Sequence, residues 1–140
     1  MTDFPAPAID EMSTPYWDGL RAGVLKYQRC LACFHAWLPP RSECPSCLSA
    51  DWAWSASRGD ASVVSWVTYH RSYHPYFADK LPYTVTLVEL AEGPRLLTNV
   101  RLESDQQLAV DAAVRLSIEE EGGVALARFR LVPEQTAPPQ

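Results

Sequence analysis

The second half of the chain alternates apolar and polar side chains with the period of two that is typical of half-buried β-strands. Within residues 113–120, the alternation is strict from Val114 to Glu119, and residues 124–131 follow it around Arg128 and Arg130. Between these segments lies a Gly122–Gly123 pair, which favours a tight hairpin turn. The pattern therefore predicts two antiparallel strands at the carboxyl end of the domain.

Three further segments have the same β character. We expect strands over residues 62–70, 83–90 and 95–102, with the Ala-Glu-Gly-Pro sequence at 91–94 forming the turn between the last two. Five antiparallel strands within about 70 residues favour a small closed barrel over an open sheet, because closure leaves no unpaired edge.

The amino-terminal part has a different pattern. Residues 13–23 predict a short helix, with Ser13 or Thr14 as its cap, Pro15 in its first turn and Gly23 at its end. Its apolar residues Tyr16, Trp17 and Leu20 recur at helical spacing, and we expect them to pack against a later part of the chain. Residues 1–12 have the composition of a flexible leader, and residues 24–30 alternate like a strand.

All four cysteines lie between residues 30 and 47, as Cys30-x-x-Cys33 and Cys44-x-x-Cys47. Two such pairs can place four thiolates at the corners of a tetrahedron around zinc, and two prolines between them help fold one pair back on the other. Unligated structural thiols and a redox pair are the weaker alternatives. Four thiolates leave no open position for substrate, so the predicted ion is a single structural zinc. His35 is a spare candidate ligand.

Composition narrows the classes of function. Twelve Lys and Arg against seventeen Asp and Glu give a formal charge of −5, which argues against a protein that binds nucleic acid. The amino terminus lacks the basic and apolar pattern of a signal peptide, and no apolar run is long enough to cross a membrane. We therefore expect a cytoplasmic protein without a membrane partner. Thiols stay reduced in that compartment, which favours metal ligation over disulfides.

The long connection between the first two barrel strands, residues 70–82, is the best candidate for a functional loop. One interpretation pairs His70 or His74 with Asp79 as a general base. No serine in a nucleophile-elbow context and no unassigned cysteine supplies a nucleophile, so we assign no catalytic residue. The other interpretation is a partner-binding loop, since the region is rich in side chains that are common at interface hot spots: Tyr69, Arg71, Tyr73, Tyr76 and Phe77.

Two other sets of residues have a functional and a structural interpretation. Three arginines could contact coenzyme A phosphates, but ordinary surface positions are favoured: Arg41, Arg71 and Arg95. Four tryptophans could stack on bases, but we expect them to form a small core that joins the ribbon to the barrel: Trp37, Trp52, Trp54 and Trp66.

The order of these features resembles a known family of zinc-ribbon and OB-fold proteins, catalogued as domain of unknown function thirty-five and associated with acyl-CoA enzymes. Three stretches carry the resemblance: CLACFHAWLPPRSECPSC, SRGDASVVSWVTYHR and LPYTVTLVELAEGPRLLTNV. The chain departs from the family pattern where Phe34, Ala61 and Asp111 replace glycines. Glycine at position 34 would take the left-handed conformation, so Phe34 implies a local adjustment of the first cysteine turn and a lower metal affinity, whereas Asp111 is among the residues that tolerate this conformation best.

The resemblance implies a mainly β fold with a short amino-terminal helix, a rubredoxin-like zinc ribbon and a five-stranded OB-fold barrel. The expected segments are a leader and helix (1–23), a zinc ribbon (24–55), an OB-fold domain (56–133) and a disordered tail (134–140). The metal ligands would be Cys30, Cys33, Cys44 and Cys47.

The resemblance also implies a function. It indicates a non-catalytic accessory subunit of a heteromeric thiolase-like enzyme, meaning a thiolase, aldolase or acyltransferase, that acts on acyl-CoA thioesters in lipid or steroid metabolism. Such a subunit would stabilise its partner, help form a channel for CoA and substrate, and assemble with it as a hetero-oligomer of two plus two chains. The alternatives are a partner of a hot-dog-fold acyl-CoA hydratase, a binder of single-stranded nucleic acid, or an enzyme that uses the 70–82 loop.

Overall fold

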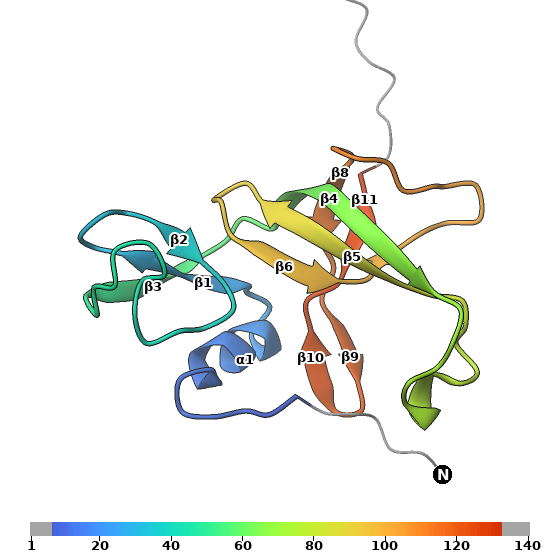
Figure 1. Ribbon diagram of the computed structural model, residues 1–140, viewed down its shortest axis with the longest axis horizontal. Coiled ribbons are helices and arrows are strands. Elements are labelled where there is room, and N and C mark those ends of the chain that lie inside the picture. The colour runs from blue at the N-terminus through green and yellow to red at the C-terminus, as the bar shows by residue number, and fades with distance from the viewer. Residues whose placement is uncertain (1–6, 133–140) are drawn as a thin grey trace, which may run out of the picture.

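The computed structural model describes residues 7–132, so the first residues of the expected leader and the expected disordered tail lie outside the described residues. The chain forms a small three-stranded sheet and a larger barrel, with one helix beside them (Figure 1). No helix within residues 7–132 has the length and apolar character that crossing a membrane requires. The elements, in chain order, are α1 (Thr14–Arg21), β1 (Lys26–Cys30), β2 (Ala36–Trp37), β3 (Trp52–Ala56), β4 (Asp60–Tyr69), the short 3-10 helix η1 (Pro75–Phe77), β5 (Tyr83–Leu90), β6 (Arg95–Thr98), β7 (Val100–Arg101), β8 (Ala113–Leu116), β9 (Glu119–Glu121), β10 (Val124–Leu126) and β11 (Phe129–Leu131).

The predicted helix is present as α1, but the Ser13 side chain has a different role from the expected one. Asp10 Oδ1 accepts the backbone N–H of Ser13 at 2.8 Å, and Ser13 Oγ accepts the backbone N–H of Asp10 at 3.0 Å. The Ser13 side chain is therefore used in this reciprocal pair and does not cap the helix itself. Gly23 ends the turn after α1 with a positive φ of 91°, as predicted.

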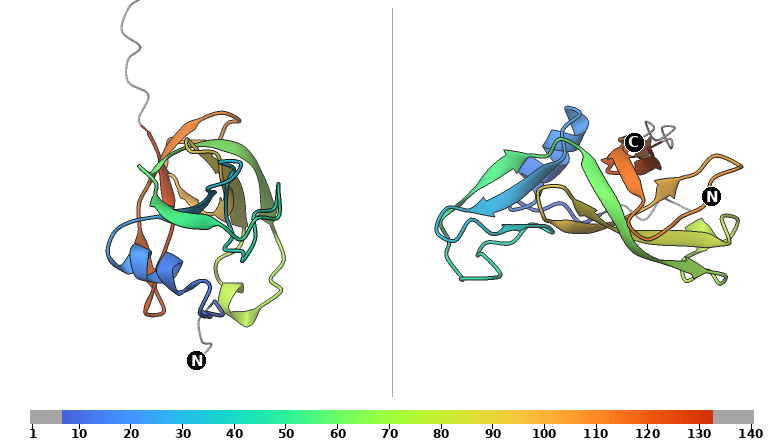
Figure 2. Two further views of the ribbon diagram at one scale, coloured as in Figure 1. Left: turned by 90° about the vertical axis from the view of Figure 1, so that its left-hand side faces the viewer. Right: turned by 90° about the horizontal axis from the view of Figure 1, so that it is seen from above.

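The ribbon is an antiparallel sheet in the order β2-β1-β3. The barrel sheet has the order β6-β5-β4-β8-β11-β7, and its two outer strands, β6 and β7, are consecutive in the chain with only Asn99 between them. The sheet therefore curls round until its last strand meets its first. Figure 2 (right) shows the ribbon and the barrel lying side by side when seen from above.

Three of the five predicted barrel strands are each divided in two. The 95–102 segment bends at Asn99, the 113–120 segment stops after Leu116, and the 124–131 segment is interrupted at Ala127 and Arg128. The second and third breaks separate the β9–β10 hairpin from the barrel, and this hairpin turns aside to lie along α1 (Figure 1). Strand alternation cannot report such breaks, because the side chains keep their period through the bend.

The two parts have separate apolar cores. The barrel core contains Val63, Val88 and Phe129, each fully buried, and it extends to Leu20 of α1 and Leu25. Tyr16 and Trp17 also pack against it, which confirms their predicted structural role. The junction between ribbon and barrel is thus made by α1 and its neighbours.

The tryptophans do not join the two parts, so that prediction was wrong. Trp37 and Trp52 pack on the buried Cys30 and Cys44 inside the ribbon, and Trp54 extends this cluster through an edge contact with Trp52. Trp66 lies on β4 of the barrel with 39% of its surface exposed. Residue type alone could not separate these positions, since the ribbon fills its own core with the rings.

Candidate functional site

The two cysteine pairs form matching turns. In the first, the backbone N–H of Phe34 donates to the Cys30 carbonyl, and in the second the N–H of Leu48 donates to the Cys44 carbonyl. Each turn also aims two backbone N–H groups at its first sulfur. Cys30 Sγ accepts from Ala32 (3.3 Å) and Cys33 (3.4 Å), and Cys44 Sγ accepts from Ser46 (3.4 Å) and Cys47 (3.5 Å). Backbone N–H groups arranged in this way stabilise thiolates.

The four sulfurs converge on one point. Cys30 Sγ lies 3.5 Å from Cys47 Sγ, Cys33 Sγ lies 3.6 Å from Cys44 Sγ, and all four lie within 4.8 Å of one another. Zinc bound at about 2.3 Å to four tetrahedral sulfurs separates them by about 3.8 Å, so the observed spacing fits zinc and not disulfides. The four cysteines are therefore positioned to bind one metal ion. His35 stacks on Trp37 instead of joining the sulfurs.

The electrostatic environment favours the thiolate form at the first cysteine of each pair, whereas the neighbouring sulfurs and burial raise the pKa of Cys47 to about 12. The N–H of Cys33, together with that of Ala32, lowers the pKa of the Cys30 thiol to about 6. Burial opposes ionisation of Cys44, but the N–H groups of Cys47 and Ser46 lower the pKa of that thiol too. Cys30 and Cys44 are buried, whereas Cys33 and Cys47 are exposed. One side of the metal centre thus faces the ribbon core and the other faces solvent.

A buried glutamine holds the loop between the two cysteine pairs. The side chain of Gln28 on β1 is fully buried; its Nε2 donates to the Arg41 carbonyl at 2.8 Å, and its Oε1 accepts the Arg41 N–H at 2.7 Å. These two bonds pair the Gln28 side chain with the backbone of Arg41 as a neighbouring β-strand would, and they hold the adjacent Pro39–Pro40 segment against the sheet. Arg41 therefore acts here through its backbone, and the only signal of this contact in the sequence is a polar residue within a short predicted strand.

The residue after each second cysteine has an unusual backbone conformation. Phe34 and Leu48 both have φ of 66°, and Asp111 in the barrel has 67°. Asp111 has the left-handed conformation expected for it, whereas Phe34 takes the conformation of the glycine that it replaces without the local adjustment expected there, and Leu48 repeats this conformation in the second turn. For a bulky side chain this conformation costs roughly 1–2 kcal/mol, whereas aspartate tolerates it better.

The 70–82 loop does not assemble the general-base pair that was one interpretation of its sequence. Nδ1 of His74 accepts the Tyr76 N–H at 3.0 Å and thereby caps η1. Within residues 7–132, the side chains of His70 and Asp79 form no hydrogen bond or ion pair with each other or with His74. The loop is held instead by aromatic contacts, including Phe77 with Tyr83 at 4.8 Å between ring centroids.

Next to this loop, a polar cavity of about 450 Å³ opens at the end of the barrel. Asn99 is one of the residues that line it: its Nδ2 donates to the Thr84 carbonyl at 2.6 Å, and its Oδ1 accepts the Tyr83 hydroxyl at 2.9 Å. The guanidinium of Arg128 also donates to Asn99 Oδ1, and its Nη2 donates to Glu121 Oε2 at 3.2 Å. Neither Asn99 nor Arg128 was predicted from the sequence, because the two meet only when the barrel closes.

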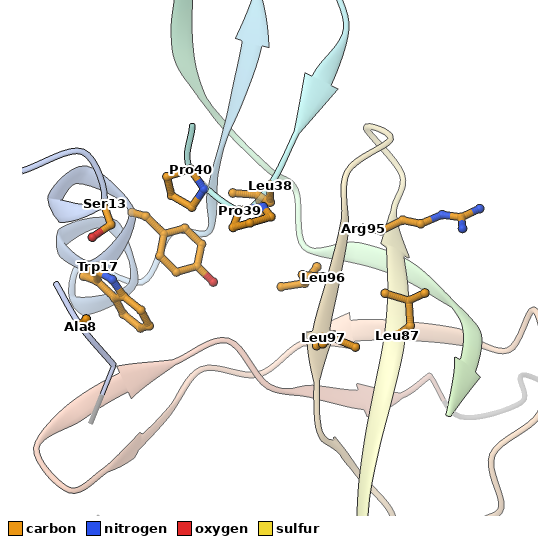
Figure 3. A pocket seen from close by; sticks show the side chains of 11 residues that line it. Ala8, Ser13, Trp17, Leu38, Pro39, Pro40, Leu87, Arg95, Leu96 and Leu97 are labelled. Carbon is orange, nitrogen blue, oxygen red and sulfur yellow. The ribbon is translucent and has the colours of Figure 1, made fainter. Parts of the chain in front are cut away.

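A second, apolar cavity of about 480 Å³ lies where α1, the loop after β2 and strands β5 and β6 meet (Figure 3). Trp17, Pro39 and Leu97 line it from these three directions, and Arg95 stands on β6 at its edge. The Arg95 guanidinium pairs with Glu89 at 2.9 Å. The cavity could not be predicted from the sequence, because three distant segments contribute to it.

The chain matches two family models that together cover most of it. The model described as the rubredoxin-like zinc ribbon domain of ChsH2 matches residues 17–53, and the model described as the C-terminal OB-fold domain of ChsH2 matches residues 54–119.

Two curated relatives are similar in sequence. The probable enoyl-CoA hydratase alpha subunit of Thermomonospora curvata is 35% identical over 133 residues, which cover 94% of this chain and 41% of the relative. The 3-oxo-4,17-pregnadiene-20-carboxyl-CoA hydratase alpha subunit of Mycobacterium tuberculosis is 32% identical over 109 residues, which cover 78% of this chain and 34% of the relative. The chain thus spans well under half the length of these relatives.

Two solved structures are similar in fold. A chain of the Ltp2-ChsH2(DUF35) aldolase has a TM-score of 0.77 and 34% sequence identity, over 90% of this chain and 98% of that one. A DUF35-family protein of unknown function from Sulfolobus solfataricus has a TM-score of 0.60 and 18% identity, over 87% and 86% of the two chains. The second supports the fold alone.

Proposed function

The chain belongs to the ChsH2 family of zinc-ribbon and OB-fold proteins, and we propose that it is the non-catalytic subunit of a heteromeric thiolase-like enzyme that acts on acyl-CoA thioesters. One observation carries the proposal. The similar chain of the Ltp2-ChsH2 aldolase is covered over 98% of its length, so the likeness includes both the ribbon and the barrel. An aldolase assembly therefore already uses a chain of this size and architecture.

The arrangement of the chain's own residues supports a structural role. The four cysteines would hold one zinc ion, which when bound supplies a crosslink between the two cysteine turns and leaves no position for a substrate. In the described part of the chain, no cysteine or serine side chain is hydrogen-bonded to a histidine side chain that could activate it. The partner would therefore supply the nucleophile and the base, while this chain supplies a rigid surface.

The apolar cavity is the part of this subunit best suited to a share in the substrate channel. Its volume of about 480 Å³ is in the range of small-molecule sites, and it lies at a junction between parts of the fold, where such sites are common. Burial raises the pKa of Tyr16, which lines it, to about 12, so this hydroxyl stays neutral and can donate a hydrogen bond. We place the apolar part of the thioester or of the partner's channel here.

A partner of the hydratase class is the second candidate, because both curated relatives are named as alpha subunits of CoA hydratases. The same accessory role would then serve a hydration reaction. For either partner we propose a two-plus-two assembly in the cytoplasm, where the thiols needed for zinc remain reduced.

Co-expression tests the proposal directly. The tagged chain is produced with each thiolase-like and hydratase-like subunit encoded by its own organism, and the purified complexes are examined by size-exclusion chromatography with light scattering. A stable complex with a thiolase-like subunit, whose cleavage or formation of a carbon–carbon bond in an acyl-CoA depends on this chain, supports the proposal. A complex with a hydratase-like subunit alone selects the second candidate. A chain that associates with neither, or that turns over acyl-CoA alone, refutes both.

A binding assay tests the alternative that the chain binds single-stranded nucleic acid. Fluorescence anisotropy with a single-stranded oligonucleotide should show no binding at physiological salt, because the net charge is −5. Tight, salt-dependent binding would instead support the nucleic-acid alternative.

A further inference from the structure

The wall of the apolar cavity carries few polar side chains. Among the side chains that line it, four have an N–H or O–H group: Ser13, Tyr16, Trp17 and Arg95. Ser13 Oγ already accepts a backbone N–H at 3.0 Å, and Arg95 Nε donates to a carboxylate at 2.9 Å at the edge of the cavity. Figure 3 shows the six-membered ring of Trp17 nearer to the strands than its nitrogen. Tyr16 therefore supplies the donor that is best placed for a ligand.

The Tyr16 hydroxyl is both unpaired and accessible. Within residues 7–132 it has no hydrogen-bond partner, and its ring makes an edge contact with Trp17 at 5.0 Å between ring centroids. The unpaired side-chain atoms that are fully enclosed by protein belong to other residues, so the Tyr16 oxygen remains open to a ligand. Burial raises the pKa of Tyr16 to about 12, which keeps the hydroxyl protonated at neutral pH. A buried tyrosine hydroxyl usually has a partner, and here the protein does not supply one.

The chemistry of the cavity restricts what it can hold. Most of its wall is aliphatic or aromatic, and no carboxylate is among the described residues that line it. A volume of about 480 Å³ with a single well-placed donor suits a ligand group that is apolar over most of its surface and carries one acceptor oxygen. A charged group would lose its hydration here, whereas a ketone or hydroxyl oxygen can accept the Tyr16 hydrogen without that cost.

We infer that Tyr16 is a specificity-determining residue, whose hydroxyl donates a hydrogen bond to a ketone or hydroxyl oxygen on the apolar part of the acyl group. This inference rests on the proposed function. In that function the partner carries the catalytic groups, so the reacting thioester carbonyl has to lie at the partner's own site. The cavity of this chain then receives a part of the acyl group that is remote from the thioester. The substrate class is therefore an acyl-CoA with a remote oxygen function.

The fold holds the Tyr16 donor in place before a ligand binds. Tyr16 packs against the barrel core beside Leu20, which is 1% exposed and fixes α1 on the barrel. On the opposite wall, the bonds of Gln28 to Arg41 hold Pro39. A donor fixed in this way costs little entropy when it binds an oxygen. A ligand without the oxygen leaves the donor unpaired, so the cavity discriminates between the two.

A pair of matched probes tests the inference. The first is a thioether of coenzyme A with a decahydronaphthalen-2-ylmethyl group, and the second is its 6-oxo derivative. Neither has a thioester bond that the enzyme can cleave, and the two differ in a single acceptor oxygen. Isothermal titration calorimetry measures both affinities on the zinc-loaded chain in complex with the partner subunit identified by co-expression. We expect the oxo probe to bind about five- to tenfold more tightly.

Tyr16→Phe should abolish this preference, because it removes the hydroxyl and keeps the ring. The affinity for the probe without the oxygen should stay unchanged, and the thermal midpoint should be equal or higher, since an unpaired hydroxyl is lost. The matched control is Tyr27→Phe. It removes a tyrosine hydroxyl in the ribbon that already accepts Arg29 Nη2 at 3.3 Å, and it should keep the preference for the oxo probe.

The possible outcomes separate the inference from the proposed function. If the complex forms but the unaltered chain shows no preference, or Tyr16→Phe retains it, the inference is overturned and the proposed function stands. An equal loss of affinity for both probes in Tyr16→Phe would assign the residue to packing alone and would also overturn the inference. If co-expression yields no partner enzyme, the proposed function fails and the inference fails with it.

Discussion

Replacement of Gln28 by leucine tests whether one buried amide determines the shape of the ribbon. Leucine keeps much of the volume but removes both hydrogen bonds to the backbone of Arg41, at 2.8 and 2.7 Å. A buried polar group left without its partner costs about 1–3 kcal/mol, and two such groups are affected. Because the Arg41 side is partly open to water, we expect the lower part of the summed range, a loss of about 2–3 kcal/mol in the free energy of unfolding.

Urea unfolding of the zinc-loaded protein, followed by tryptophan fluorescence, measures this loss. The probe is local, since Trp37 and Trp54 are the cross-strand neighbours of Gln28 in the ribbon sheet. The matched control is Gln107→Leu, at an exposed glutamine, which should change stability by less than about 0.5 kcal/mol. A loss for Gln28→Leu no larger than the control, at an unchanged slope of the transition, would refute the reasoning.

Three other predictions concern the metal, the segment between β3 and β4, and a partly buried phenol. Removal of zinc by a strong chelator should unfold the ribbon and shift tryptophan emission to the red, and added zinc should reverse the change. Glu92→Ala should lower the urea midpoint by an amount equivalent to about 1–2 kcal/mol, because the Glu92 carboxylate accepts the Ser57 hydroxyl at 2.8 Å and the Arg58 N–H at 2.9 Å. The control is Glu89→Ala, which removes an exposed ion pair and should cost less than about 1 kcal/mol. Tyr16 has a pKa of about 12 in the folded protein against 10.0 in the unfolded chain. Its neutral form therefore contributes stability that is fully present below pH 10 and is lost as the pH rises toward 12. In a series of urea midpoints measured against pH, Tyr16→Phe should remove this loss of stability at alkaline pH.

Much of the fold is predictable because its signals are local. The 83–90 strand is found at the expected residues, since its inward positions, including Val88 and Leu90, are buried in strict alternation. The cysteine pairs converge because their spacing encodes the two turns. Breaks in the other strands are not local signals. The bend at Asn99 is fixed by its bonds to Thr84 and Tyr83, which come from a different strand.

Some parts of the candidate site are also predictable from the sequence and others are not. The four sulfurs can be named from the sequence, because each ligand's neighbours in the chain determine its geometry. The apolar cavity cannot, because Trp17, Pro39 and Leu97 are brought together only by the packing of ribbon, helix and barrel. The grouping of Trp66 with the ribbon tryptophans failed for the same reason, since residue type does not tell to which core a ring belongs.

The backbone conformation of Leu48 follows from the repeat of the two cysteine pairs, although it was not predicted from the sequence. A local adjustment was expected at Phe34, but each cysteine turn is closed by the same bond: the N–H of the residue after the second cysteine donates to the carbonyl of the first. A repeated turn requires a repeated backbone conformation, so Cys47-Leu48 implies the same φ as Cys33-Phe34, and both are 66°. The metal-binding turns therefore dictate the backbone at these two positions but place no demand on the side chains, which are largely exposed. Bulky apolar residues at both positions are therefore not a requirement of folding.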